Sequence, residues 1–271
     1  FGAIQLQGDQ AIQAYSEKFD GYRPERIEVD LDDLKTAQNE LSADLRDAID
    51  KAYDNIYAFH KAQLTERIQL DVQDGVSCWQ EKRPIEKVGL YVPGGTAPLF
   101  SSVLMLAIPA TIAGCREIVL CTPPNQSGQL APAIRYAAYK CGVTRLFQVG
   151  GIQAIGGMTF GTQTIPKVYK ILGPGNQYVT AAKQKATQYG VSIDMPAGPS
   201  ELLVVADDTA VPSYVAADLL SQAEHGTDSQ VVLVSTSQNT IEKVHEEVQK
   251  QLDALPRKEI AAQALGNSIS I

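Results

Sequence analysis

The chain has 271 residues, of which 44% are hydrophobic and 20% charged, a composition typical of globular proteins. Its formal net charge is −8, from 23 Lys and Arg against 31 Asp and Glu, and no basic stripe stands out, which disfavours a nucleic-acid partner. No apolar stretch approaches the ~20 residues of a transmembrane helix and no signal peptide precedes the first segment, so we expect a cytoplasmic protein without membrane contact.

The first part of the chain is predicted to be helical, over residues 1–65. Ser42 is a suitable N-cap, and apolar residues recur after it at helical spacing. A hairpin is predicted next, because strand-like segments 67–72 and 76–80 flank the turn Asp74-Gly75. This opening portion shows no pattern typical of a catalytic site.

From residue 88 the pattern changes to alternating strands and helices. The predicted strands are 88–92, 117–121, 145–149 and 167–172. The predicted helices are 99–113, 133–141, a short one opened by Gly150-Gly151, and one running from Asn176 to Tyr189. Such alternation predicts βαβ units and a parallel sheet.

A second series follows Pro196–Pro199, which we interpret as the crossing point between domains. Its predicted strands are 201–206 and 230–234, and its predicted helices are 212–225, with Gly226 as the residue after the helix, and 240–255. The sequence therefore predicts two Rossmann-like sheets.

Both ends of the sequence are unusual. Phe1 begins an apolar pattern that looks like the inside of a helix, and residues 268–271 alternate like a strand that stops halfway. We expect segments of a longer protein to be absent at both ends.

The cysteines of the chain form no C-x-x-C pair, and we expect reduced, mostly buried thiols. Spacing alone leaves open that one of them is reactive. The cysteines are Cys78, Cys115, Cys121 and Cys141.

Glycine-rich turns at 93–95, 150–151 and 173–175 follow predicted strands of the first series. Ligands of open parallel sheets bind beyond the carboxyl ends of the strands, where helix N-termini can face a pyrophosphate. None of the turns is G-x-G-x-x-G, and each alone is explained as a tight turn. Three of them in one domain favour a ligand.

Gln222 and His225 lie three residues apart on one predicted helix, so their side chains share a face, and both types can bind a divalent metal. Spacing alone favours a polar pair at a helix end over a metal site. His60 and His245 are predicted on solvated helix faces, and we expect Asp207-Asp208 to form a turn rather than to meet a ribose.

Five segments together resemble the histidinol dehydrogenase family, in its order and at compatible spacing. They are 88–102, 149–155, 173–180, 194–201 and 218–226. The resemblance extends over essentially the whole chain and implies two Rossmann-like, aldehyde-dehydrogenase-like domains. We expect 1–86 to be a helical segment and hairpin of the first domain, 87–199 the NAD-side domain, and 200–271 a truncated second unit with the zinc and substrate motif.

The family oxidises L-histidinol to L-histidine with two molecules of NAD, through an aldehyde-level intermediate. The resemblance implies that Tyr91, Gln153 and Asn176 contact NAD. It implies that Ser200 contacts the substrate and that Gln222 and His225 are two ligands of a zinc ion that holds the substrate. For this pair it reverses the preference drawn from spacing. Thr227 departs from the proline often found there, with no consequence for these roles.

The family's general base, a Glu-His pair in a Gly-Pro-Glu-His segment, has no match here, and neither do its remaining Asp and His zinc ligands. We expect all of them beyond Ile271, so no catalytic base is assigned and this chain alone is expected to be inactive. The resemblance also implies a homodimer of the intact protein. Two alternatives stay open: a relative that oxidises another small alcohol, and a cofactor-binding module without catalysis.

Overall fold

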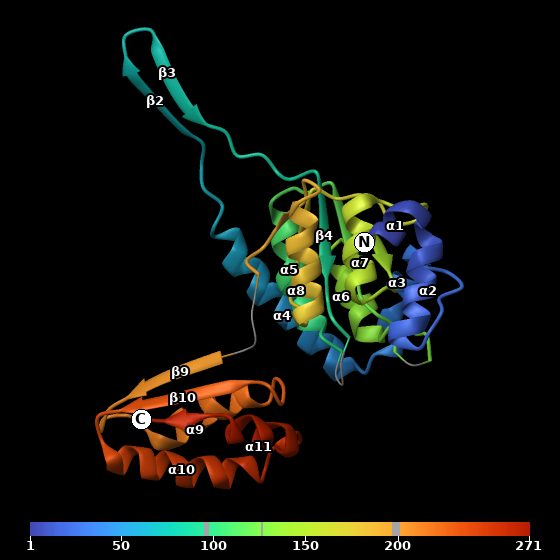
Figure 1. Cartoon of the computed structure of the whole chain (residues 1–271). Coiled ribbons are helices and arrows are strands. Elements are labelled where there is room, and N and C mark those ends of the chain that lie inside the picture. Colours follow the sequence, from blue (N-terminus) through green and yellow to red (C-terminus); the bar gives the residue numbers. More distant parts are fainter. Residues whose placement is uncertain (95–97, 126, 197–200) are drawn as a thin grey trace. The chain divides into compact units, whose positions relative to one another are not determined.

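A computed structural model describes residues 1–94, 98–125, 127–196 and 201–271. It consists of two compact units, Phe1–Pro196 and Ala197–Ile271, which divide the chain between Pro196 and Ala197 (Figure 1). The first unit contains both the helical opening segment and the first series of alternating strands and helices.

A six-stranded sheet of order β1-β6-β5-β4-β7-β8 forms the centre of the first unit. Strands β4 to β8 are parallel: β4 (Lys87–Tyr91), β5 (Glu117–Cys121), β6 (Arg145–Phe147), β7 (Lys170–Leu172) and β8 (Ser192–Ile193). The short β1 (Glu28–Val29) joins the edge antiparallel to β6. The predicted parallel sheet of this unit is therefore confirmed.

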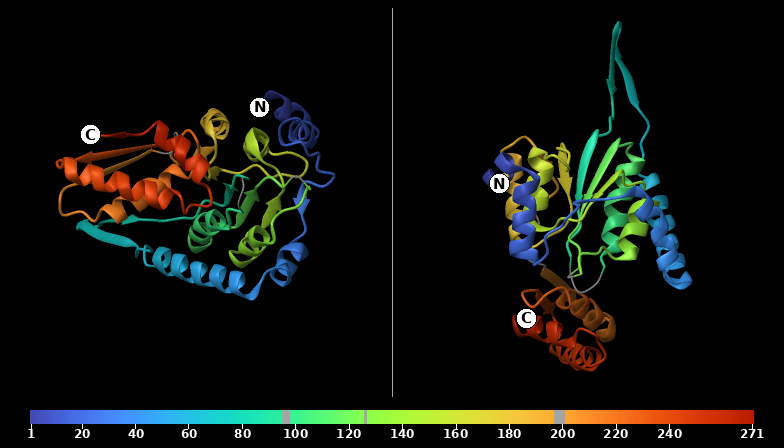
Figure 2. Two further views of the ribbon diagram at one scale, coloured as in Figure 1. Left: turned by 90° about the horizontal axis from the view of Figure 1, so that it is seen from below. Right: turned by 90° about the vertical axis from the view of Figure 1, so that its right-hand side faces the viewer.

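Helices cover both faces of this sheet, as Figure 2 shows in its right-hand view. One face carries α4 (Ala43–Lys61), α5 (Phe100–Ile112) and α6 (Pro132–Lys140), together with α3 (Leu31–Thr36) and the 3-10 helix η1 (Ala37–Glu40). The other carries α1 (Gly2–Gln7), α2 (Asp9–Asp20), α7 (Gly151–Phe160) and α8 (Gln177–Thr187).

The strands bury alternate residues against these two helix layers. In β5, Ile118 and Leu120 belong to the core under α5 and α6, whereas Val119 and Cys121 belong to the core under α7 and α8. Successive side chains of a strand point to opposite faces, so a strand apolar throughout needs cover on both sides. The continuous apolar run 118–121 thus explains the doubly wound arrangement.

Strand β1 lies inside the segment 1–65, and the prediction that this segment is helical throughout is wrong there. Two residues are too short for a recognisable period, and the partner strand lies far along the chain. The pairing is reinforced by a side-chain contact, since Arg145 Nε donates to Glu28 Oε1 at 2.7 Å. The remaining structure of this segment is mostly helical, and Ser42 caps α4 as expected by accepting a hydrogen bond from the Leu45 N–H.

The predicted hairpin is confirmed as β2 (Ile68–Gln73) and β3 (Val76–Gln80), with Gly75 at φ 76° in the turn. Figure 1 shows it extending away from the sheet of its own unit, and all residues of both strands are exposed. Cys78 is therefore exposed, Cys115 is half-buried, and Cys121 and Cys141 are buried, so two of the four thiols are buried where most were expected to be. All four are free.

The second unit has a parallel sheet of order β11-β10-β9, as predicted. Its elements are β9 (Glu201–Ala206), α9 (Pro212–Ala223), β10 (Gln230–Ser235), α10 (Gln238–Leu252), α11 (Lys258–Gly266) and β11 (Ile269–Ser270). Helix α9 ends before the predicted 225, because the chain turns tightly there: the His225 N–H donates to the Gln222 carbonyl at 3.1 Å. Among the described helices, none combines the length and hydropathy of a membrane-spanning segment.

Candidate functional site

The order of strands places a topological switch point between β4 and β7. From β4 the chain proceeds outward to β5 and β6, and from β7 it proceeds in the other direction to β8. The loops that leave these two neighbouring strands therefore diverge, and in open parallel sheets such a point is where ligands bind. Tyr91 ends β4, and Asn176 ends the loop after β7.

Tyr91 is buried, and its side chain joins the end of β4 to the start of α7. The Gly151 N–H donates to Tyr91 Oη at 3.0 Å. Burial raises the pKa of Tyr91 to about 12, although the hydrogen bond from Gly151 favours the ionised form. The hydroxyl is therefore neutral at physiological pH and keeps a proton to donate.

Gln153 lies in α7 and is only 2% exposed. Its Nε2 donates to Asp20 Oδ2 at 2.7 Å, at the last residue of α2. Burial raises the pKa of Asp20, and the hydrogen bond from Gln153 partly offsets this. The carboxyl of Asp20 was not anticipated from the sequence, because nothing near it in the chain points to a partner in α7.

Asn176 is exposed and is the N-cap of α8. Its Oδ1 accepts hydrogen bonds from the N–H groups of Tyr178 and Val179, both at 3.1 Å. Because the cap uses the oxygen, the Asn176 amide can offer a ligand only its N–H donors. The structure thus links Tyr91 and Gln153 through the start of α7, and leaves Asn176 exposed on the neighbouring loop.

The glycines of the predicted turns allow loops to pack tightly against one another. A Cβ on Gly94 or Gly150 would lie 2.7 or 2.6 Å from Pro123, and a Cβ on Gly173 would overlap the Tyr91 carbonyl oxygen. Gly95 lies outside the described residues. Close packing accounts for the described glycines without a ligand, in line with the tight-turn interpretation.

A hollow of about 180 Å³ lies at the carboxyl ends of β4 and β5. Its lining includes Pro93, Gly94, Thr122, Pro123 and Asn125. Ligand pockets for small molecules are typically ~300–1,000 Å³, so this hollow has room for only part of a dinucleotide.

In the second unit, Gln222 is the last but one residue of α9 and His225 lies two residues beyond the helix, so the prediction that His225 occupies its last turn is wrong. His225 Nδ1 lies 2.9 Å from the Ser221 carbonyl oxygen. A carbonyl oxygen only accepts, so Nδ1 carries a proton, and in the neutral ring Nε2 then presents its lone pair. Gln222 Nε2 is buried without a hydrogen-bond partner.

This pair fits part of a zinc site. Metal-binding histidines usually donate their other ring N–H to a carbonyl or carboxylate, as His225 does here. The described residues contain no group of three or more His, Cys, Asp and Glu that could hold a metal ion. A catalytic zinc usually takes three protein ligands, so these two donors are a partial set. Ser200, the expected substrate contact, lies outside the described residues.

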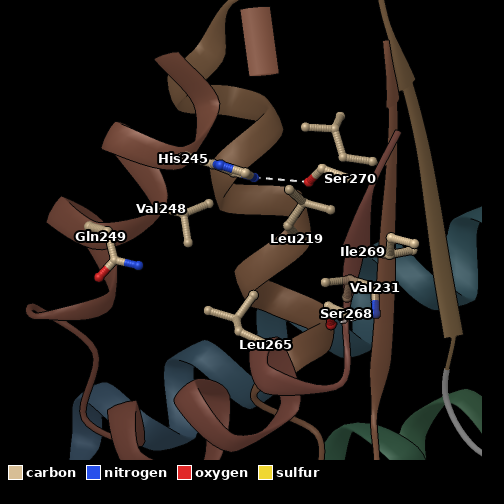
Figure 3. A pocket seen from close by; sticks show the side chains of 10 residues that line it. Leu219, Val231, His245, Val248, Gln249, Leu265, Ser268, Ile269 and Ser270 are labelled. Carbon is tan, nitrogen blue, oxygen red and sulfur yellow. Dashed lines mark hydrogen bonds between the residues drawn. The ribbon is translucent and has the colours of Figure 1, made fainter. Parts of the chain in front are cut away.

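A pocket of about 310 Å³ in the second unit lies among α9, α10, α11 and the strands β10 and β11 (Figure 3). Leu219, Val248 and Leu265 contribute apolar walls, and His245 Nε2 lies 2.9 Å from Ser270 Oγ. His245 is exposed as expected, but this hydrogen bond was not anticipated. No carboxylate in the described part of the chain hydrogen-bonds to His245, so the pair lacks the third member of a nucleophilic triad.

The other predictions for polar residues can be checked directly. His60 is half-buried rather than fully solvated, and its Nδ1 lies 3.3 Å from Gln63 Oε1. Asp207 Oδ1 accepts hydrogen bonds from the Thr209 backbone N–H at 2.9 Å and from its hydroxyl. Asp207 thus stabilises a turn, as predicted.

The doubly wound sheet and its helix layers define the fold class of aldehyde-dehydrogenase-like α/β proteins. The structure of an NAD-dependent aldehyde dehydrogenase from Sinorhizobium meliloti superimposes with a TM-score of 0.53 at 14% identity, over 93% of this chain and 48% of that one. At this identity the likeness shows the fold alone.

The histidinol dehydrogenase family model matches residues 1–271, and the chain belongs to that family. Histidinol dehydrogenase of Bacteroides thetaiotaomicron is 54% identical over 265 residues, which are 98% of this chain and 62% of that protein. The crystal structure of histidinol dehydrogenase from Elizabethkingia anophelis matches with a TM-score of 0.95 at 54% identity. It covers all of this chain, which spans 62% of that one.

Replacement of Tyr91 by Phe should weaken the first unit and change its response to alkaline pH. The Gly151 N–H loses its acceptor, which should lower the free energy of unfolding by about 1 kcal/mol. The Tyr91 pKa is raised from 10.0 to about 12 on folding, so the hydroxyl stabilises the fold fully below pH 10 and loses this contribution as pH rises toward 12. The free energy of unfolding of Tyr91→Phe, measured with urea, should therefore fall less steeply over this pH range than that of wild type.

The comparison is internally controlled, because the pKa of Tyr136 is also raised to about 12 and this group is unchanged in the variant. Identical alkaline slopes for the two proteins would contradict the assigned burial of Tyr91.

Proposed function

We propose that this chain carries the cofactor-binding part and part of the zinc site of an NAD-dependent histidinol dehydrogenase. The reaction is the oxidation of L-histidinol to L-histidine by two hydride transfers via histidinal, the last step of histidine biosynthesis. Membership of the family over residues 1–271 is the observation that supports this most strongly. A cytoplasmic location is part of the proposal, since the substrate and cofactor are soluble metabolites.

NAD is the proposed ligand of the switch point between β4 and β7. When bound, NAD accepts the hydride. The Asn176 amide donates to it, and the helix dipole at the start of α8 favours a phosphate there. Tyr91 keeps a neutral hydroxyl with a proton to donate, and Gln153, whose Nε2 is held by Asp20, offers its oxygen.

Zinc is the proposed ligand of Gln222 and His225. When bound, the ion supplies positive charge and a template for the substrate, without a redox role. His225 offers Nε2 because its Nδ1 proton is donated to the Ser221 carbonyl, and Gln222 offers its amide oxygen. Ser200 is the proposed substrate contact. No residue of this chain is proposed as the catalytic base.

The 271-residue chain should therefore be catalytically silent and bind zinc poorly. A positioned general base contributes typically ~10²–10⁴-fold, and two zinc donors are fewer than a catalytic site usually has. NADH formation with histidinol, zinc and NAD should be at background, whereas the Bacteroides thetaiotaomicron relative, assayed in parallel, should turn over. Turnover by this chain within about tenfold of that of the relative would show that the catalytic residues lie within residues 1–271, contrary to the proposal.

Variants at Asn176 test the NAD site. Asn176→Ser and Asn176→Asp keep an oxygen that can cap α8 but remove the amide donor, whereas Asn176→Ala removes both. All three should lower NAD affinity in calorimetric titration at millimolar NAD. Only the alanine variant should also lose about 1 kcal/mol of stability. Equal NAD affinity for wild type and Asn176→Ser would argue against this contact.

We further propose that the intact protein is a homodimer, and the hairpin supports this. One of its faces is apolar and exposed, with Ile68 at 61% and Leu70 at 62%. A two-stranded hairpin is marginal alone in water, and an apolar face of this kind is typical of an interface. Leu70→Glu in the intact protein should shift the mass measured by light scattering toward the monomer. Gln69→Glu, on the opposite face, should not; an unchanged mass for Leu70→Glu would rule out the hairpin as the interface.

A further inference from the structure

An ion pair between a buried lysine and a half-buried aspartate lies next to the loop after β7. Lys183 occupies α8, and its side chain is only 5% exposed. It forms an ion pair with Asp194, which directly follows β8. Lys183 Nζ also donates to the carbonyl oxygen of Gly173 at 2.6 Å.

The same pair also holds the other polar group of Gly173. Asp194 Oδ2 accepts a hydrogen bond from the Gly173 N–H at 2.7 Å. Asp194 is itself anchored to β7, because its backbone N–H donates to the Ile171 carbonyl at 3.3 Å. The N–H and the C=O of Gly173 are thus fixed by two side chains that form an ion pair with each other.

The position of Lys183 in α8 is one where an apolar residue would be expected. The buried residues of α8 are Val179, Ala182, Lys183 and Ala186, which form the core-facing stripe of an amphipathic helix. Burial of an ion pair is often no more stabilising than apolar residues of similar size. The presence of a charged group on this stripe therefore indicates a geometric role.

Gly173 has little freedom to move on its other side. Its φ of 132° favours glycine, and a Cβ there would overlap the Tyr91 carbonyl oxygen. The loop passes directly against the end of β4 and reaches Asn176 three residues later. Any shift of Gly173 away from Tyr91 would move Asn176 and the first turn of α8 with it.

We propose that Lys183 and Asp194 are positioning residues: their ion pair holds Gly173 against Tyr91 and so places Asn176 and the N-terminus of α8 for the dinucleotide. The identity of the ligand rests on the proposed function, whereas the placement of Asn176 does not. Neither residue touches the ligand, and both act through the backbone of Gly173.

Lys183→Met tests the role of the lysine, because methionine keeps most of the apolar length and removes the ammonium. Loss of the clamp should loosen the Asn176 cap, so the amide protons of Tyr178 and Val179 should exchange about fivefold faster or more. Amides near the end of α8, such as that of Ala186, should be unchanged. NAD affinity should fall about as far as in Asn176→Ala. The matched control is Lys185→Met, at an exposed lysine of the same helix.

The double variant Lys183→Met/Asp194→Asn covers the case in which the single variant folds poorly with an unpaired, half-buried carboxylate. It should regain stability but not the wild-type exchange rates or NAD affinity. Wild-type exchange at Tyr178 and Val179 in a folded variant would overturn the proposal, as would wild-type NAD affinity with faster exchange. If wild type itself binds no NAD, the proposed function fails at this edge, and the exchange rates alone decide the positioning role.

Discussion

The contact of Gly173 with the backbone of Tyr91 is the constraint on which the edge of the first sheet depends. β4 and β7 are neighbours, and the loop after β7 passes directly against the end of β4 before the two loops diverge. This is possible only where one loop has no side chain, as at Gly173. The paths of both loops, and with them the place where α8 begins, follow from that approach.

Polar side chains around this edge pair with groups on other elements of the chain. Tyr91 is paired with Gly151, Gln153 with Asp20, and Lys183 with Asp194. Each pair connects two different elements, so the elements that leave the sheet edge are cross-linked by hydrogen bonds as well as by apolar packing. Buried polar groups are expensive to leave unpaired, and such links therefore favour one arrangement of the loops over its alternatives.

The sequence predicted elements that carry a strong local signal and missed those defined by distant partners. The Ser42 cap, the Asp74-Gly75 turn and the apolar run of β5 each carry their pattern within a few residues, and all were confirmed. Strand β1 exists only because β6 lies beside it, and no local pattern could reveal it. For the site, spacing placed Gln222 and His225 near each other. The orientation of the His225 ring depends on a backbone carbonyl that no sequence pattern displays.

The hairpin has a consequence for how the chain folds. Its ladder joins residues close in sequence, but a two-stranded hairpin is marginal alone in water, so its stability depends on another surface. The unit that carries the hairpin does not cover its apolar face. A newly made chain therefore exposes this face and the unpaired strand edges until another surface binds them. Asp71 and Asp74 lie within this segment, and charges so placed act as gatekeepers against aggregation. When the chain is synthesised at high concentration, assembly through the hairpin therefore competes with aggregation through the same hairpin.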